Sequence, residues 1–202
     1  MTNSASITVE FTKRRELIRM RAEIDRLREE NERLSLLAYR DPLTGLRNRR
    51  CFGERLGEEI SRLKRTKAGA ISLVLVDVNG FKALNDTLGH AAGDRALQGV
   101  ASALESLVRA EDLVCRVGGD EFVLLLPDTD LEQASKVVER LRAHAPSLTG
   151  FGLGPRPLAL GVGTWREGDD ELTLLSRADA AMYADKRSSR PSVAEEPLAR
   201  AA

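Results

Sequence analysis

Residues 116–122 read Arg-Val-Gly-Gly-Asp-Glu-Phe and place two carboxylates next to a pair of glycines. Apolar runs on both sides predict two strands that this segment joins as a hairpin. We expect Gly118 and Gly119 to take the positive φ angles of a two-residue turn, with Asp120 and Glu121 at its tip. Because glycine has no Cβ, a phosphate chain can approach the backbone N–H groups there while the acids hold a divalent cation on it. An ordinary hairpin turn with a solvated acid is the alternative.

A second acid follows an apolar strand earlier in the chain. Residues 70–76 read Ala-Ile-Ser-Leu-Val-Leu-Val and lead directly into Asp77. Two acids at the ends of neighbouring strands, Asp77 and Asp120, are what a two-metal site needs to polarise a phosphate and to activate an attacking hydroxyl. The pattern leaves open whether these two strands are neighbours.

Several further blocks surround these acids along most of the chain. They are residues 41–49, 77–82, 85–86, 89–90, 93–94, 116–122 and 178–183, with Lys186 last. In their order and spacing these blocks resemble the GGDEF domain, the catalytic module of diguanylate cyclases. The resemblance implies an α/β (α+β) fold like the palm of nucleotidyl cyclases, with a central, mostly antiparallel sheet flanked by helices.

The resemblance also implies a reaction. Each domain is expected to bind one GTP, and two domains meet so that each 3′-hydroxyl attacks the α-phosphate of the other GTP. The products are cyclic di-GMP and two pyrophosphates, and a monomer holds only half of the site. Two Mg²⁺ ions per GTP, with Mn²⁺ as a substitute, are the implied cofactors. The alternative is a catalytically silent domain that binds GTP or cyclic di-GMP and signals through its N-terminal helix.

The resemblance assigns the chemistry to a small set of residues. Asp77, the Val78 carbonyl and Asp120 are the expected metal ligands. Asp120 is also expected to help deprotonate the 3′-hydroxyl, and Glu121 to complete or orient the metal shell. The expected phosphate contacts are Phe81, Lys82, Gly118, Gly119, Lys186 and Arg190. A core position for Phe81 and a solvated helix end for Lys186 and Arg190 are the alternatives.

Guanine is expected to be recognised by Asn85, Asp94 and His90. A carboxylate can accept hydrogen bonds from both N1–H and N2–H of guanine, and an amide suits the remaining polar positions. Asp94 with Asn85 therefore favours guanine over adenine. A local structural hydrogen bond is the alternative role of His90.

A regulatory site is implied upstream of the hairpin. Residues 109–112, Arg-Ala-Glu-Asp, match the inhibitory Arg-x-x-Asp motif of the family, in which Arg109 and Asp112 grip the product. Cyclic di-GMP is thus an expected feedback inhibitor. Arg140, on a later helix, is placed to supply a second guanidinium from a neighbouring domain, and a plain surface arginine is its alternative reading.

The first forty residues carry a heptad pattern. Apolar residues and one amide recur in steps of three and four, at Leu17, Met20, Ile24, Leu27, Asn31, Leu34 and Ala38. With Leu17 at an a position, acids fall at g and arginines at e, as in the pair Glu16 and Arg21, which favours a parallel coiled coil. A buried Asn31 favours two strands. We expect a parallel homodimer, and a solvated amphipathic helix is the alternative.

Composition narrows the class of protein. The chain has 31 basic and 31 acidic residues, so there is no electrostatic case for nucleic acid. Its longest apolar run is too short to cross a membrane, and its first residues lack the features of a secretion signal. Cys51 and Cys115 are expected to be small core residues in a reducing compartment. These features favour a cytoplasmic enzyme without a membrane partner.

Four segments are expected: a flexible N-terminus at 1–11, a coiled-coil helix at 12–40, the GGDEF domain at 41–187 and a disordered tail at 188–202. Within them we expect helices at 12–39, 49–65, 81–88, 93–108, 131–144 and 172–186, and strands at 70–76, 113–117, 122–126 and 158–162.

Overall fold

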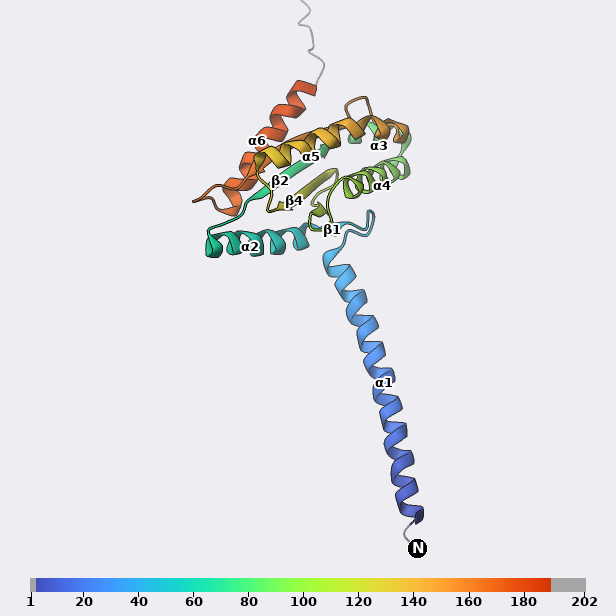
Figure 1. The fold of residues 1–202 in the computed structure, drawn as a ribbon. Coiled ribbons are helices and arrows are strands. Elements are labelled where there is room, and N and C mark those ends of the chain that lie inside the picture. Colours follow the sequence, from blue (N-terminus) through green and yellow to red (C-terminus); the bar gives the residue numbers. More distant parts are fainter. Residues whose placement is uncertain (1–2, 190–202) are drawn as a thin grey trace, which may run out of the picture. The chain divides into compact units, whose positions relative to one another are not determined.

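A computed structural model describes residues 3–189 (Figure 1). In chain order its elements are α1 (Asn3–Tyr39), β1 (Arg47–Asn48), α2 (Arg49–Thr66), β2 (Ile71–Val78), α3 (Phe81–Leu88), α4 (His90–Ser106), β3 (Leu113–Arg116), β4 (Glu121–Pro127), α5 (Leu131–His144), the 3₁₀ helix η1 (Ala145–Phe151), β5 (Leu158–Thr164) and α6 (Glu171–Ser189). The chain divides into two compact units between Arg40 and Asp41. The predicted tail lies almost wholly outside the described residues.

The second unit is built on one five-stranded sheet in the order β1-β3-β4-β2-β5. Every neighbouring pair is antiparallel except β1 with β3, which is parallel. The predicted mixed α/β fold with a mostly antiparallel sheet is confirmed. Strand β1 was not predicted, because two residues carry no readable periodicity.

The two faces of the sheet bury separate apolar cores, because successive residues of a strand point to opposite faces. On one face, Val74 and Leu124 pack with Leu97 of α4 and Leu141 of α5. On the other face, Leu73, Val123 and Leu125 pack with Leu56 of α2 and Leu174 of α6. Residues 77 and 121 belong to this second face, so the acids there look toward the side covered by α2 and α6.

Helix ends follow local sequence signals. The Asn48 side chain accepts a hydrogen bond from the Cys51 N–H and caps α2. Asp130 and Gln133 form a capping box at the start of α5. Helix α4 begins at His90 rather than at the expected Gly93, directly after Gly89, whose positive φ of 80° turns the chain between α3 and α4.

Helix α6 lies unusually close to strand β5, and two glycines make this approach necessary. A Cβ added at Gly161 would lie 2.1 Å from the Met182 backbone nitrogen, and one at Gly163 would lie 2.8 Å from the Leu174 carbonyl oxygen. The preceding Leu160 is buried in the core. The helix backbone therefore sits directly on the strand, which fixes α6 against the sheet.

Helix α1 forms the first unit and begins at Asn3, so it includes most of the segment expected to precede it. Its predicted seam residues Leu17, Met20, Ile24, Leu27 and Leu34 are between 47% and 59% exposed in the single chain. Its ion pairs are local, joining Arg26 to Glu23 and Arg33 to Glu30 one helical turn apart. The apolar stripe is thus left open for a partner of similar character.

Two further expectations concern the core and the membrane. Cys51 and Cys115 are both buried, and burial raises the pKa of the Cys115 thiol to about 12. Among the described residues, no helix is both long enough and apolar enough to cross a membrane.

Candidate active site

Strand pairing brings the predicted acids together. Strands β2 and β4 are neighbours, and their register sets Asp77 directly opposite Glu121. The Val78 N–H donates to the Asp120 carbonyl oxygen at 3.1 Å. The Asp77 and Glu121 side chains therefore stand on the same face of the sheet, with Asp120 at the adjoining turn.

The turn itself differs from the prediction. Neither Gly118 nor Gly119 has a positive φ, and the register pairs Arg116 with Phe122, so the loop is longer than a two-residue hairpin. The expectation of a two-residue primed turn is wrong, because a longer loop reverses the chain without left-handed residues. The Val117 N–H closes it by donating to the Glu121 carbonyl oxygen at 3.0 Å.

The two glycines of the turn instead provide space. A Cβ at Gly118 would lie 2.5 Å from Glu121 Oε2, so Gly118 leaves room for that carboxylate. A Cβ at Gly119 would meet no atom within 4 Å, so the backbone there is open to an approaching group. A phosphate chain can reach main-chain N–H groups at such a place.

Arg116 holds this turn in place. Its Nε and Nη2 donate to the Gly119 carbonyl oxygen at 3.2 and 2.7 Å. Its Nη1 donates to the two carboxylate oxygens of Asp41 at 3.0 and 3.2 Å. Because the Gly119 carbonyl belongs to the peptide that joins Gly119 to Asp120, the guanidinium fixes the backbone from which the Asp120 carboxylate projects.

Asp41 is bound from two directions. Its Oδ1 accepts from the Thr44 N–H at 2.8 Å and from the Thr44 hydroxyl at 2.7 Å, in addition to Arg116. Burial alone would raise the pKa of Asp41, but the two Thr44 donors and the Arg116 guanidinium together hold this pKa below its ordinary value. The sequence showed both Asp41 and Arg116 inside motif blocks but gave no sign that they pair.

Lys186 is placed on Asp77. Its Nζ donates to both Asp77 carboxylate oxygens, at 2.7 and 2.8 Å. Asp77 is only 7% exposed, so little of its carboxylate is open to solvent while the ammonium is bound. Without a nucleotide, Lys186 thus bonds Asp77, and its contact with phosphate stays a prediction. Arg190, its predicted companion, lies outside the described residues.

The predicted guanine residues lie on α3 and α4, two helices that pack against each other at Asn85 and Gly93. A Cβ at Gly93, next to Asp94, would lie 2.0 Å from Asn85 Oδ1, so the Asn85 amide packs against the helix that carries Asp94. Asn85 Oδ1 is buried without a hydrogen-bond partner in the described part of the chain. Since buried polar atoms are nearly always paired, this orphan oxygen marks a place where a ligand could compensate. Asp94 and His90 are exposed nearby on α4.

Helix α3 starts at Phe81, which puts the N–H groups of Phe81 and Lys82 at a helix N-terminus, where anions are favoured. The Phe81 side chain is partly buried and packs against the core. Its side chain thus has the core position given as the alternative, while its backbone remains at the helix start.

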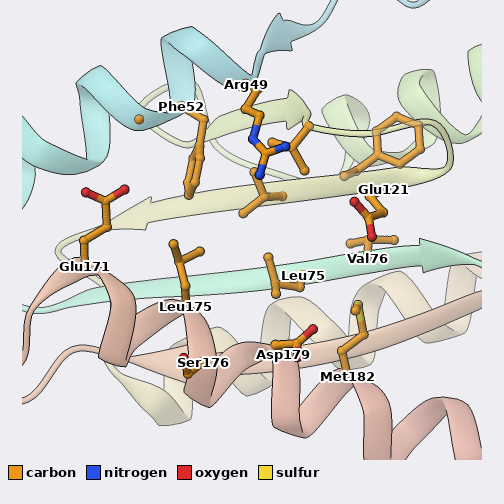
Figure 2. A pocket seen from close by; sticks show the side chains of 14 residues that line it. Arg49, Phe52, Leu75, Val76, Glu121, Glu171, Leu175, Ser176, Asp179 and Met182 are labelled. Carbon is orange, nitrogen blue, oxygen red and sulfur yellow. The ribbon is translucent and has the colours of Figure 1, made fainter.

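A cavity of about 520 Å³ opens beside Glu121, between α2, α6 and the sheet. Figure 2 shows Arg49 and Phe52 of α2 on one side and Leu175, Asp179 and Met182 of α6 on the other. Its floor is apolar and its edge is charged. The sequence gave no signal for it, because its walls come from elements far apart in the chain.

The predicted metal ligands fit a cation that arrives with a phosphate. Within residues 3–189, no three His, Cys, Asp or Glu side chains cluster closely enough to hold an ion by themselves. Mg²⁺ commonly takes only one or two carboxylates from a protein and completes its shell with water and substrate phosphates. Asp77, Asp120 and the Val78 carbonyl are hard oxygen donors of this kind, at adjoining positions of β2 and the turn.

The predicted inhibitory residues also lie together. The Arg109 N–H donates to the Asp112 carboxylate at 2.9 Å, which closes a turn between α4 and β3. Arg140 of α5 donates to the Leu107 carbonyl oxygen at 2.9 and 2.6 Å, in the same domain. Burial raises the pKa of Asp112, although the Arg109 N–H and the charges of Arg109 and Arg140 oppose that shift. A contact of Arg140 with a neighbouring domain stays a prediction.

The chain is similar in sequence to known proteins. Residues 38–192 match the family described as "Diguanylate cyclase, GGDEF domain". The chain is 42% identical over 165 residues to the response regulator PleD of Caulobacter vibrioides, covering 78% of this chain and 36% of PleD. It is 40% identical over 157 residues to the diguanylate cyclase DgcP of Pseudomonas aeruginosa, covering 76% of this chain and 23% of DgcP. The chain thus spans about a third of the length of PleD and about a quarter of the length of DgcP.

Solved structures give the same result. The coiled coil and GGDEF domain of DgcB from Caulobacter crescentus, in complex with c-di-GMP, superposes with a TM-score of 0.80 at 28% identity, covering 89% of this chain and 96% of that one. The diguanylate cyclase SiaD of Pseudomonas aeruginosa, in complex with its activator SiaC, gives a TM-score of 0.70 at 39% identity, covering 92% and 74%. On the family match and these likenesses together, the chain belongs to the GGDEF family of diguanylate cyclase domains.

Proposed function

We propose that this protein is a diguanylate cyclase that condenses two GTP molecules into cyclic di-GMP and releases two pyrophosphates. The observation that carries the proposal is the pairing of β2 with β4, which sets Asp77 opposite Glu121 and ties Val78 to Asp120 beside the open backbone of Gly119. The 42% identity to PleD and the 40% identity to a named diguanylate cyclase support it.

GTP binds along one end of the sheet. Asn85 and Asp94 take the guanine, and the buried Asn85 Oδ1 without a partner supports this placement. The N–H groups at the start of α3 and the open backbone at Gly119 receive the phosphates. The Lys186 ammonium, on the long stem of a lysine, turns to the phosphates once they are present.

Two Mg²⁺ ions, or Mn²⁺ in their place, held by Asp77, Asp120 and the Val78 carbonyl, would neutralise phosphate charge and make the attacking hydroxyl more acidic. Glu121 keeps these ligands oriented from the facing strand position. Arg116 keeps the Asp120 backbone in place during the reaction.

The chemical step is a phosphoryl transfer between two nucleotides. Asp120 accepts the proton of a 3′-hydroxyl as that oxygen forms a bond to the α-phosphorus of the other GTP. The bond between this phosphorus and the bridging oxygen of the β-phosphate breaks, and pyrophosphate leaves with the electron pair. The same exchange in the opposite half closes the ring, so two GTP yield one cyclic di-GMP and two pyrophosphates.

Two domains must meet for this step, and α1 supplies a means. Its exposed stripe, with Asn31 at a central position, suits a parallel two-stranded coiled coil. Joining the domains through this coil raises their effective concentration toward each other. The family likeness to DgcB, solved with its coiled coil, supports the arrangement.

Product inhibition is the second regulatory element of the proposal. Arg109 and Asp112 form one closed turn, and the Arg140 guanidinium lies close enough to influence the Asp112 carboxylate. An arginine pair with a carboxylate suits a guanine base and a phosphate. Cyclic di-GMP bound there would hold two domains apart from the productive pose.

The test is to incubate the purified protein with GTP and Mg²⁺ and to separate the nucleotides by chromatography, with Asp120→Ala alongside. Cyclic di-GMP and pyrophosphate in a 1:2 ratio, absent from the variant, are expected from the reaction's balance. Bound GTP without product would instead favour the silent receptor.

A further inference from the structure

The Lys186 ammonium occupies the carboxylate of Asp77, which is one of the proposed metal ligands. It bonds both oxygens of the Asp77 carboxylate, at 2.7 and 2.8 Å, and the lysine side chain is 37% exposed against 10% for the aspartate. A Mg²⁺ ion would need an oxygen of the same carboxylate at about 2.0–2.1 Å. An ammonium and a metal ion that both bound this carboxylate would lie close together and repel each other. Asp77 can therefore bind only one of them strongly at a time.

The helix that carries Lys186 cannot withdraw to resolve this competition. Its backbone sits on β5 at Gly161, where a Cβ would clash with Met182. The neighbouring Asp185 accepts from the Leu160 N–H at 2.8 Å and from Arg142 at 2.8 Å, which ties the end of α6 to strand and to α5. Only the flexible lysine side chain is left to move, and its four-carbon stem allows that.

We infer that Lys186 is a placeholder for the cation at Asp77, so that the nucleotide-free protein excludes free divalent metal and accepts it only together with a nucleotide triphosphate. This inference rests on the proposed function. When a metal–nucleotide complex enters, the metal takes the Asp77 oxygens and the phosphates give the ammonium a new partner. The exchange gives each charge a partner, whereas a metal ion alone would take Asp77 from the partly buried ammonium and supply nothing in its place.

A placeholder and a residue that only binds phosphate differ in their effect on metal affinity. A residue that only binds phosphate has no effect on metal affinity before the nucleotide arrives. A placeholder lowers that affinity, so its removal must raise it. The two roles therefore predict different results in a measurement without nucleotide.

The experiment measures Mn²⁺ binding to the full chain by the loss of the free-ion electron paramagnetic resonance signal. Wild type is expected to bind Mn²⁺ weakly, and Lys186→Met more tightly by about 10- to 100-fold. Lys186→Arg keeps the charge and should stay weak. Lys136→Met, which removes an equal charge from an exposed pair with Glu132, should match wild type. Thermal melts show that each variant is folded.

A second arm adds a GTP analogue whose α- and β-phosphates are joined by a methylene group, so that pyrophosphate cannot leave. Wild type should then bind Mn²⁺ tightly, while Lys186→Met should bind the analogue less tightly than wild type. Equal Mn²⁺ affinity of nucleotide-free wild type and Lys186→Met, with tight binding of the Mn²⁺–analogue complex to wild type, overturns the placeholder and leaves the proposed function intact. No Mn²⁺ binding in either arm, by any variant, overturns the metal site and with it the proposed function.

Discussion

Arg116 and Lys186 both bind an acid near the Gly118–Gly119 turn, and they do so in different ways. Arg116 bonds two groups at once, the Asp41 carboxylate and the Gly119 carbonyl, and its side chain is only 14% exposed. Lys186 bonds one carboxylate and is 37% exposed. A planar guanidinium with several fixed donors suits a permanent bridge, whereas an ammonium on a flexible stem suits a partner that changes. The same charge thus gives a fixed support in one place and an exchangeable contact in the other.

The largest effect is expected from Arg116→Ala. It leaves the Asp41 carboxylate without its guanidinium and frees the turn, so the free energy of unfolding should fall by about 3 kcal/mol and turnover roughly 100-fold. Denaturant unfolding and cyclic di-GMP production measure the two effects. Unchanged turnover in a folded variant would show that the turn keeps its shape without this bridge.

Exchanging the two cationic side chains tests whether the guanidinium or the charge alone matters at each position. Arg116→Lys keeps the charge but cannot reach both partners, so kcat should fall about tenfold with KM nearly constant. Lys186→Arg should change kcat less and act mainly on KM. Steady-state kinetics on both variants separates the two parameters, and equal behaviour of the two variants would remove the distinction drawn between them.

Displacing Lys186 without changing its charge gives a smaller effect. Gly161→Ala puts a methyl group 2.1 Å from the Met182 backbone nitrogen and pushes α6 away from β5. Stability should fall by about 2 kcal/mol and KM for GTP should rise. Gly57→Ala, at a helical glycine with no atom within 4 Å of the added Cβ, is the matched control and should be neutral or slightly stabilising. A neutral Gly161→Ala would mean that α6 can shift without cost.

The smallest effect concerns pH. The Thr44 donors and the Arg116 guanidinium hold the pKa of Asp41 below its ordinary value, so its ionised form is favoured by folding. The stability it contributes is fully present above the unfolded pKa and is lost as pH falls through the lower folded pKa. The stability difference between wild type and Asp41→Asn should therefore be constant near neutral pH and shrink below about pH 4. Unfolding midpoints across the acid range would reveal it, and a difference that grows on acidification would contradict it.

The elements of the fold were largely readable from the sequence. Helices at 81–88 and 131–144 have the predicted bounds, because glycines at 80 and 89 flank the first and a capping box starts the second. The prediction of a two-residue hairpin turn was wrong, since a glycine pair indicates backbone flexibility but not the length of the loop. The short strand β1 was missed because only its pairing with β3 makes these two residues a strand.

The site was readable in part. Asp77, Asp120 and Glu121 were expected to meet, and the pairing of β2 with β4 brings them together. The bridge from Arg116 to Asp41 was not foreseen, because the two lie 75 positions apart and nothing local links them. The contact of Lys186 with Asp77 was not foreseen either, since a sequence motif does not state which partner a side chain holds before a ligand arrives, and its phosphate contact stays a prediction.

The place of Asp41 matters for anyone who wishes to build a chimeric enzyme from this domain. Asp41 is the first residue of the second unit, immediately after the break at Arg40, and it already holds the turn through Arg116. A receptor module spliced in ahead of the domain should therefore be joined before Asp41. A junction placed a single residue later would delete the carboxylate that anchors Arg116, and the fusion would be impaired whatever signal its new module detects.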